Sequence, residues 1–299
     1  MDLKQIEYFI RVAEIGSFTR ASIDLGIAQP ALSRQVRLLE VELRQNLLLR
    51  NGRGVTLTDA GKLLLDHGRG IMHQIARTRE ELSRVRGSLV GKVAIGLPPS
   101  LSKILTVPLI HSFKAHLPEA SLSVTEGLSS SMVESIIAGR LDMALLYNAA
   151  PSAEIELTPL AEEPLYLVQG SHLSSENTLP IELKDLPDYP LIMPTPNNAI
   201  RQFVESELTT LGLKPDIALE IDSINAILDL VADGAGSAVL SINAVNNLGA
   251  EHKLLARPIT QPGLHIKLYM ACSARRPATL TQKAVIDLMQ QKASLLFAD

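Results

Sequence analysis

The feature that most constrains the fold is a pair of short helical segments separated by a tight turn near residue 26. The first segment runs from about Phe18 to Leu25, and Gly26 supplies the turn, because glycine adopts positive φ without steric cost. Gln29-Pro30 opens the second segment, since proline is tolerated in the first turn of a helix. The apolar residues of this segment recur at spacings of four, three and four, which places one face inward: Leu32, Val36, Leu39 and Leu43.

The flanking residues extend this pattern into three helices and a hairpin. Apolar residues at helical spacing predict a helix that ends at Gly16. Two short β-prone runs flank Asn51-Gly52-Arg53-Gly54, which is a turn signal for a hairpin. Thr58 can cap a long helix from about Asp59 to Arg86. Three short helices followed by a basic hairpin predict a winged helix-turn-helix.

The start of the second segment carries side chains that can read DNA. In a helix-turn-helix, the first residues of the second helix reach base edges in the major groove. Gln29, Ser33 and Arg34 occupy this stretch or its outward face. A glutamine can pair with adenine and an arginine with guanine, each contributing about 1–3 kcal/mol of discrimination. The alternative is that Gln29 caps the helix and the arginine is a solvated surface residue.

Other polar residues of this region suit the DNA backbone. Ser17, Thr19 and Arg37 could contact phosphates, which position a protein without reading sequence. Arg50 and Arg53 flank the hairpin tip, where an arginine can enter a narrow minor groove. The full set of candidate DNA-binding residues is Ser17, Thr19, Gln29, Pro30, Ser33, Arg34, Arg37, Arg50 and Arg53.

The charge of the chain is distributed unevenly. Residues 1–90 contain 14 Lys and Arg and 10 Asp and Glu, a balance of +4. Because the net charge of the whole chain is −4, residues 91–299 carry a balance of −8. A basic segment joined to an acidic body indicates that one end meets a polyanion. Chance clustering is the alternative.

After residue 90, short buried strands alternate with helices. The expected strands lie near 93–97, 122–125, 143–147, 165–168, 191–193, 217–221, 237–240 and 266–271. The expected helices lie near 100–116, 132–138, 199–211 and 225–232, with a last helix from Thr279. This alternation predicts parallel sheets with helices on both faces. About 200 residues of it suggest two α/β lobes with a cleft between them, where ligands favour the carboxyl ends of strands.

Two stretches resemble a known family. Residues 18–40, FTRASIDLGIAQPALSRQVRLLE, look like the helix-turn-helix of LysR-type transcriptional regulators, and residues 47–61, LLLRNGRGVTLTDAG, resemble the wing and linker-helix start of that family. The total length of the chain and the α/β region from about residue 91 also fit this family. Within the family the chain is most similar to the nitrogen assimilation control type. Three positions depart from the pattern: Ser22 replaces a frequent alanine, Gln45 a helix-ending glycine and Leu49 a frequent aromatic.

The resemblance implies a domain organisation and an assembly. It implies a winged helix-turn-helix over 1–58, a linker helix over 59–90 and a regulatory domain over 91–299. The regulatory domain would have two periplasmic-binding-protein-like lobes, lobe I (about 91–161 and 267–299) and lobe II (about 162–266). The linker helix would pair antiparallel with that of a second copy, and its apolar stripe supports this in part: Leu63, Leu64, Ile71, Ile75, Leu82 and Val85. The alternative is that this helix packs on its own body. A tetramer of two dimers, an interrupted inverted-repeat operator on double-stranded DNA and contact with RNA polymerase are likewise implied.

The resemblance also implies an effector between the lobes. Matched by position, the contacts come from loops that follow strands and precede helices: Pro99, Ser100, Leu101, Leu128, Ser129, Thr195, Pro196, Asn197, Arg201 and Ser223. Hydroxyls, amides and free N–H groups at helix starts favour an anion, so a small carboxylate is the expected ligand, with Arg201 assisting. The alternative is that Ser100, Ser129 and Ser223 are only helix caps.

An enzyme is the second class of function. The sequence contains no Gly-x-Gly-x-x-Gly after a strand, no phosphate-binding Gly-x-x-x-x-Gly-Lys-Ser/Thr loop and no Gly-x-Ser-x-Gly elbow. The seven histidines are scattered, and Cys272 is the only cysteine. We therefore expect no catalysis, no metal and no cofactor. The charged amino terminus and the lack of a long apolar run predict a cytoplasmic chain without a membrane segment.

Overall fold

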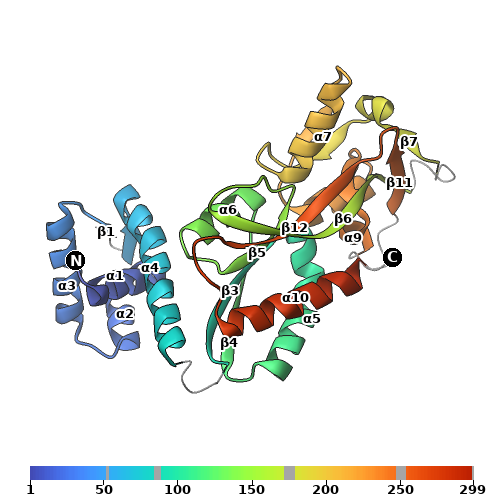
Figure 1. Cartoon of the computed structure of the whole chain (residues 1–299). Coiled ribbons are helices and arrows are strands. Elements are labelled where there is room, and N and C mark those ends of the chain that lie inside the picture. The colour runs from blue at the N-terminus through green and yellow to red at the C-terminus, as the bar shows by residue number, and fades with distance from the viewer. Residues whose placement is uncertain (52–53, 84–88, 172–178, 247–253, 298–299) are drawn as a thin grey trace. The chain divides into compact units, whose positions relative to one another are not determined.

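The computed structural model describes residues 1–51, 54–83, 89–171, 179–246 and 254–297 (Figure 1). The chain divides into two compact units. The N-terminal unit comprises Met1–Gly87 and Ala138–Arg140, and the C-terminal unit comprises Ser88–Ile137 and Leu141–Asp299. No helix in the described ranges is long and apolar enough to cross a membrane.

Three helices form the body of the N-terminal unit: α1 (Leu3–Ile15), α2 (Phe18–Asp24) and α3 (Gln29–Leu43). Gly26, between α2 and α3, has a φ of 65°, as the sequence predicted for a tight turn. The inward stripe of α3 is confirmed, because Leu32, Val36 and Leu39 are buried against Phe9 of α1. This burial fixes α3 on the other helices and leaves its opposite face exposed.

The three departures from the family pattern are accommodated locally. Ser22 is buried, and its hydroxyl donates to the carbonyl of Thr19 at 2.8 Å. Helix α3 ends with Arg44 in the left-handed conformation, at a φ of 53°, so a residue with a side chain makes the helix end in place of glycine. Leu49 is exposed.

A hairpin and a long helix complete this unit. Strands β1 (Leu48–Asn51) and β2 (Gly54–Leu57) pair antiparallel, and α4 (Asp59–Ser83) follows. Thr58 caps α4 as predicted, because its hydroxyl accepts from the N–H of Gly61 at 3.0 Å. A Cβ on Gly61 would lie 2.0 Å from the carbonyl oxygen of Leu47, so only glycine lets α4 begin this close to the wing. The expected end of the helix at Arg86 falls outside the described residues.

The C-terminal unit is built on an eight-stranded sheet. The path is β4-β3-β5-β12-β6-β11-β7, and β10 also pairs with β6. The strands are β3 (Gly91–Leu97), β4 (Ala120–Glu126), β5 (Met143–Tyr147), β6 (Ile155–Gly170), β7 (Ile181–Glu182), β10 (Ala238–Ser241), β11 (Leu254–Thr260) and β12 (His265–Ser273). A separate pair, β8 (Leu191–Met193) and β9 (Ile217–Glu220), is parallel.

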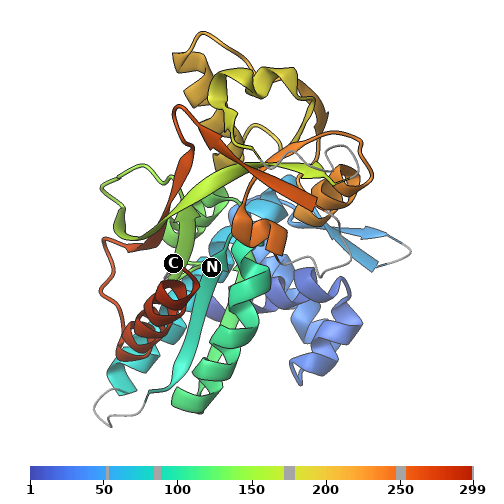
Figure 2. The same ribbon diagram turned by 90° about the vertical axis from the view of Figure 1, so that its right-hand side faces the viewer.

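The expectation of purely parallel sheets is wrong. Strand β6 pairs antiparallel with β10, β11 and β12, whereas β3 pairs parallel with β4 and β5. Strand β6 is one continuous strand of 16 residues, and β12 runs antiparallel to both β5 and β6 between them. Both expected lobe boundaries, near 161 and 266, therefore fall inside continuous strands, so the lobes share their sheet (Figure 1, and from the side in Figure 2).

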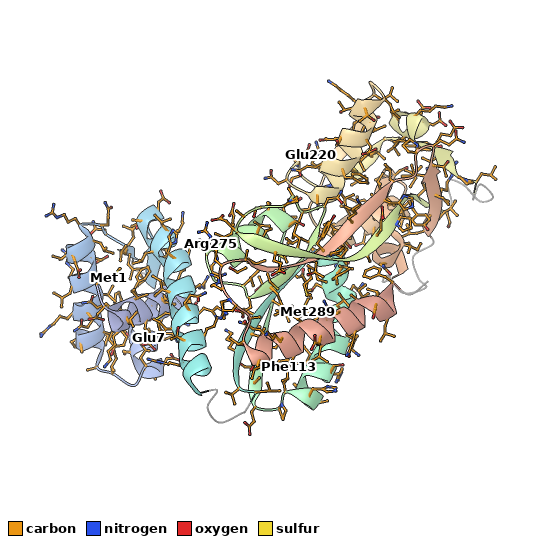
Figure 3. All side chains as sticks on the ribbon, viewed as in Figure 1. Met1, Glu7, Phe113, Glu220, Arg275 and Met289 are labelled. Carbon is orange, nitrogen blue, oxygen red and sulfur yellow. The ribbon has the colours of Figure 1, made fainter. Side chains whose placement is uncertain are left out.

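Helices cover the sheet. They are α5 (Pro99–His116), α6 (Ser129–Ile137), α7 (Ala199–Thr210), α8 (Ile224–Ala232), α9 (Ile242–Asn246) and α10 (Leu280–Leu296), with a 3-10 helix, η2 (Leu183–Asp188). Helices α5 and α10 lie side by side, and Phe113 and Met289 belong to one buried cluster (Figure 3). The fold is thus a winged helix-turn-helix with a long helix after it, followed by a two-lobed α/β domain, as predicted.

Candidate functional site

The N-terminal end of α3 presents polar side chains outward. The residue before the helix is Ala28, whose side chain makes no cap, so the alternative that Gln29 caps the helix is wrong. Gln29 and Ser33 are half-buried, whereas Pro30 and Arg34 are exposed. Among the described residues the Arg34 guanidinium has no hydrogen-bond or ion-pair partner. This leaves Arg34 free to bind another molecule.

The candidate phosphate contacts lie in different settings. Ser17 caps α2 by accepting from the N–H of Arg20, and Thr19 is exposed in the first turn of that helix. The side chain of Arg37 is 66% exposed, and its Nη1 lies 3.6 Å from Oε2 of Glu40. The Arg50 side chain and all of Arg53 lie outside the described residues.

Sequence reasoning missed Glu40. Its Oε1 accepts from the N–H groups of Leu47 and Leu48, at 2.9 and 3.2 Å. These bonds tie the end of α3 to the start of β1, so they set where the hairpin stands relative to the helix. No sequence signal marks this role, because a glutamate near a helix end is ordinarily a solvated residue.

A pocket lies between the two lobes of the C-terminal unit. The first residues of four helices line it, Pro99 of α5, Ser129 of α6, Ala199 of α7 and Ile224 of α8. Much of the remaining wall is apolar, and it includes Pro98, Leu128, Ile227, Val239 and Leu240. Apolar walls with a few polar groups are typical of a small-molecule site.

A buried hydrogen-bonded group adjoins this pocket. The Tyr147 hydroxyl donates to Oε1 of Glu163 at 2.7 Å, and the Asn243 amide donates to Oε2 at 3.2 Å. Glu163 is 2% exposed. Burial, with the negative charge of Glu163, raises the pKa of Tyr147 well above its ordinary value of 10.0, so the hydroxyl keeps its proton. Tyr147 ends β5 and Asn243 lies in α9, so Glu163 joins one residue from each lobe.

The charged side chain of the described wall at the lobe II side is Asp222, beside the polar Asn198. Its Oδ1 accepts from both the N–H and the hydroxyl of Thr195, each at 2.9 Å. Asn198 caps α7 by accepting from the N–H of Ile200, and Ser223 caps α8 by accepting from the N–H of Ala226. Ser223 therefore fulfils the capping alternative.

The pocket brings together only some of the predicted effector contacts. Pro99, Ser100, Leu128 and Ser129 line it. Leu101, Thr195, Pro196, Asn197, Arg201 and Ser223 are not part of its wall. Leu101 is instead a fully buried core residue.

The expectation that Arg201 assists a ligand is not supported by its contacts. Its Nε donates to Glu205 at 2.8 Å, and its Nη1 donates to Glu220 at 2.8 Å and to the Pro194 carbonyl at 2.9 Å. Glu220 lies at the end of β9, beside α7 (Figure 3). Arg201 therefore braces β9 and the loop after β8 against α7.

Sequence reasoning missed Tyr147, Asp222 and the apolar wall from α8 and β10. Asp222 precedes the predicted Ser223, so its position after a strand was a usable signal. Tyr147 and Leu240 occur in strands, where they look like core residues. In the described part of the chain, no group of three or more His, Cys, Asp or Glu side chains could hold a metal ion.

Comparison with known proteins is consistent with this architecture. The family model described as bacterial regulatory helix-turn-helix protein, lysR family, matches residues 3–62, and the LysR substrate binding domain matches residues 86–294. The chain is 36% identical over 291 residues to a nitrogen assimilation regulatory protein of Klebsiella aerogenes, covering 97% of this chain and 94% of that protein. It is 34% identical over 296 residues to the corresponding protein of Escherichia coli, covering 98% and 96%.

Solved structures share the fold over nearly the whole chain. The crystal structure of CbnR, a LysR family transcriptional regulator, superposes with a TM-score of 0.73 at 22% identity, covering 98% of this chain and 99% of that one. The structure of full-length CbnR with its target DNA gives a TM-score of 0.72 at 23% identity, covering 98% of each chain. The predicted likeness to the nitrogen assimilation control type is confirmed by the sequence relatives.

Proposed function

This chain belongs to the LysR family of bacterial transcriptional regulators, and from that premise we propose how its two units divide the work. As a LysR-type regulator it binds DNA through its helix-turn-helix, and the regulatory domain responds to an effector. Members of this family are regulators of transcription and are not enzymes.

We propose that α3 enters the major groove with Gln29, Ser33 and Arg34 at base edges. The free guanidinium of Arg34 supports this role, because a bidentate arginine contact with guanine needs an unpaired fork. Ser17, Thr19, Pro30 and Arg37 would lie against the backbone, and Arg50 and Arg53 would place the hairpin in a minor groove. The protein would work in the cytoplasm, with the DNA.

We propose that α4 pairs with the α4 of a second copy and that two such dimers form a tetramer. Two apolar residues of α4, Leu63 and Ile71, are 62% and 37% exposed, and pairing would remove them from water. Two-fold symmetry then requires an interrupted inverted-repeat operator. Residues 1–58, 59–90 and 91–299 would be the DNA-binding, linker and regulatory domains.

We propose that the effector occupies the pocket between the lobes and favours one arrangement of them over another. A ligand shifts such an equilibrium only by its differential affinity for the two states. The change would alter the spacing of the DNA-binding units and so the contact with RNA polymerase. The sequence favoured a small carboxylate as ligand, and the charges of the pocket point to another class, considered below.

The single observation that carries the DNA role is the exposed, unpartnered Arg34 at the start of a helix whose other face is buried. Selection of bound sequences from random DNA by the full chain should yield a two-fold-symmetric site. Arg34→Ala should weaken binding by about 1–3 kcal/mol, roughly 5–150-fold, for each of the two half-sites, and relax the preference at one position in each half-site.

A charge-matched control is Lys214→Ala, which removes an exposed cation from the C-terminal unit. It should leave the affinity and the sequence preference unchanged. Affinity should also fall steeply with added salt, because phosphate contacts release counterions. Retention of both affinity and preference in Arg34→Ala would exclude the base-reading role.

A further inference from the structure

We infer that the effector of this chain carries no net negative charge: the pocket between the lobes takes a small neutral or cationic molecule that has an apolar body and donates a hydrogen bond to Asp222. This inference rests on the proposed effector-binding role of the pocket and names the chemical class of its ligand. It replaces the carboxylate expected from the sequence.

The first observation is the charge of the wall. Among the described residues that line the pocket there is an acidic side chain, Asp222, and no Lys, Arg or His. A second carboxylate, Glu163, is buried one hydrogen bond behind the wall residue Tyr147. Its described partners, Tyr147 and Asn243, are neutral donors that leave its negative charge uncompensated. An anionic ligand would therefore contact the carboxylate of Asp222, lie near the buried Glu163 and meet no cationic side chain of the described wall.

The second observation is the place that Asp222 occupies. Helix starts favour an anion, and α7 and α8 both begin at this side of the pocket. Asp222 directly precedes the Ser223 cap of α8 and accepts both donors of Thr195 in the loop before α7. The protein thus places its own carboxylate where a ligand carboxylate would gain most from these two helices.

The third observation is that Asp222 has a site left for a ligand. Both bonds from Thr195 go to Oδ1, and Oδ2 accepts no hydrogen bond from another described residue. Asp222 is exposed at the wall of the pocket. An ammonium, amide or hydroxyl group of a ligand can therefore donate to Oδ2.

The fourth observation removes the nearest candidate counter-charge. Arg201 is buried within α7 and is already held by Glu205, Glu220 and the Pro194 carbonyl. Freeing its guanidinium for a ligand would leave two glutamates unpaired. An anion in the pocket would thus gain no cationic partner without breaking this group.

The test uses three probes that share a carbon skeleton and differ in charge: n-butylamine, butyramide and butyrate. Binding of each to the full chain without DNA is measured by saturation-transfer NMR and by the shift in Tm. We expect the amine and the amide to bind and butyrate to bind at least about tenfold more weakly. Butyrate binding as tightly as the amide would overturn the inference, as would failure of both the amine and the amide to bind.

The variant Asp222→Asn keeps the shape and an acceptor for Thr195 while removing the charge. It should weaken the binding of n-butylamine by about tenfold and reduce the difference in affinity between butyramide and butyrate. The control Asp233→Asn removes an exposed carboxylate that does not line the pocket, and it should leave all three probes unchanged. Equal effects of the two variants would mean that overall charge, and not Asp222, sets the preference.

DNA binding separates this inference from the proposed function. Both variants should bind the selected operator as the wild type does, because neither residue belongs to the N-terminal unit. If the operator is bound but butyrate binds more tightly than the amine and the amide, the inferred ligand class is wrong and the regulator role stands. If no operator is bound, the regulator role itself fails, whatever the probes do.

Discussion

The two candidate sites of this chain are built in opposite ways. The DNA-reading residues proposed on α3 lie within about one and a half helical turns of one another, are exposed or half-buried, and stand on a helix whose other face is core. The pocket is assembled from the starts of α5, α6, α7 and α8, together with residues of β5 and β10. A site held by one helix depends on local spacing, whereas a site held by many segments depends on how a whole domain packs.

The strongest way to break this contrast is to unfold one unit alone. Phe9 is fully buried in the core of the N-terminal unit, so Phe9→Ala should cost that unit about 3–5 kcal/mol of stability. Hydrogen exchange followed by mass spectrometry should show faster exchange in α1–α3 and unchanged exchange in β3, β5 and β12. The control Ile23→Ala, at a side chain that is 76% exposed, should change neither. Equal loss of protection in both units would mean that they do not fold independently.

The reverse experiment disturbs the pocket and spares α3. Tyr147→Phe leaves Oε1 of the buried Glu163 without its donor, which should cost the C-terminal unit about 1–3 kcal/mol in the free energy of unfolding. Urea titration with exchange readouts on β5 and β6 measures this loss. Operator affinity without a ligand should stay as in the wild type. Tyr269→Phe, at a half-buried strand tyrosine outside the pocket wall, is the matched control.

Alkaline pH should sharpen the contrast by destabilising only the C-terminal unit. Burial raises the pKa of Tyr147 well above 10.0 and that of Cys272 from 9.0 to about 11. At a pH between its unfolded and folded pKa values, each group keeps its proton in the folded state and loses it in the unfolded state. Their stabilisation is therefore complete below pH 9 and declines first between 9 and 11 for Cys272 and then above 10 for Tyr147. Each group lowers the free energy of unfolding by at most about 1.4 kcal/mol per pH unit in its range. Tyr147→Phe should remove the contribution of Tyr147 to this pH dependence.

The smallest effect concerns the reactivity of Cys272, the only cysteine. Burial and the nearby Glu156 and Asp142 raise the pKa of this thiol to about 11. Alkylation by iodoacetamide near neutral pH should be about tenfold slower in the folded chain than in urea, because the lower thiolate fraction outweighs its greater nucleophilicity. Equal rates in the two states would show that folding does not raise the pKa of this thiol.

The same contrast explains what the sequence could predict. The N-terminal unit follows from local signals, namely the apolar spacing of Leu32, Val36 and Leu39 and the turn at Gly26, so its helices were placed almost to the residue. Pro99, Ser100, Leu128 and Ser129, which line the pocket, follow strands and lie at or beside helix starts, so their positions in the sequence suffice to propose them as contacts. These signals need only neighbouring residues.

The errors came from features that depend on distant segments. Strand β6 includes Pro159, Pro164 and three glutamates, which argue against a 16-residue strand in the sequence, and pairing with β12 overrides them. Strand β11 was missed for a similar reason, since Arg257 and Pro258 interrupt its apolar pattern. Arg201 looked like a free cation because its partner Glu220 lies on another element.

The place of β12 in the sheet also bears on the order in which the protein is made. This strand lies between β5 and β6, although the ribosome produces it after both of them. Until it emerges, β5 and β6 present unpaired edges, whereas the N-terminal unit has its helices and hairpin complete and can fold first. A nascent or truncated chain that lacks β12 would thus hold a finished DNA-binding unit beside an unfinished regulatory domain. The sheet of the regulatory domain is thus completed by a strand that is made almost last.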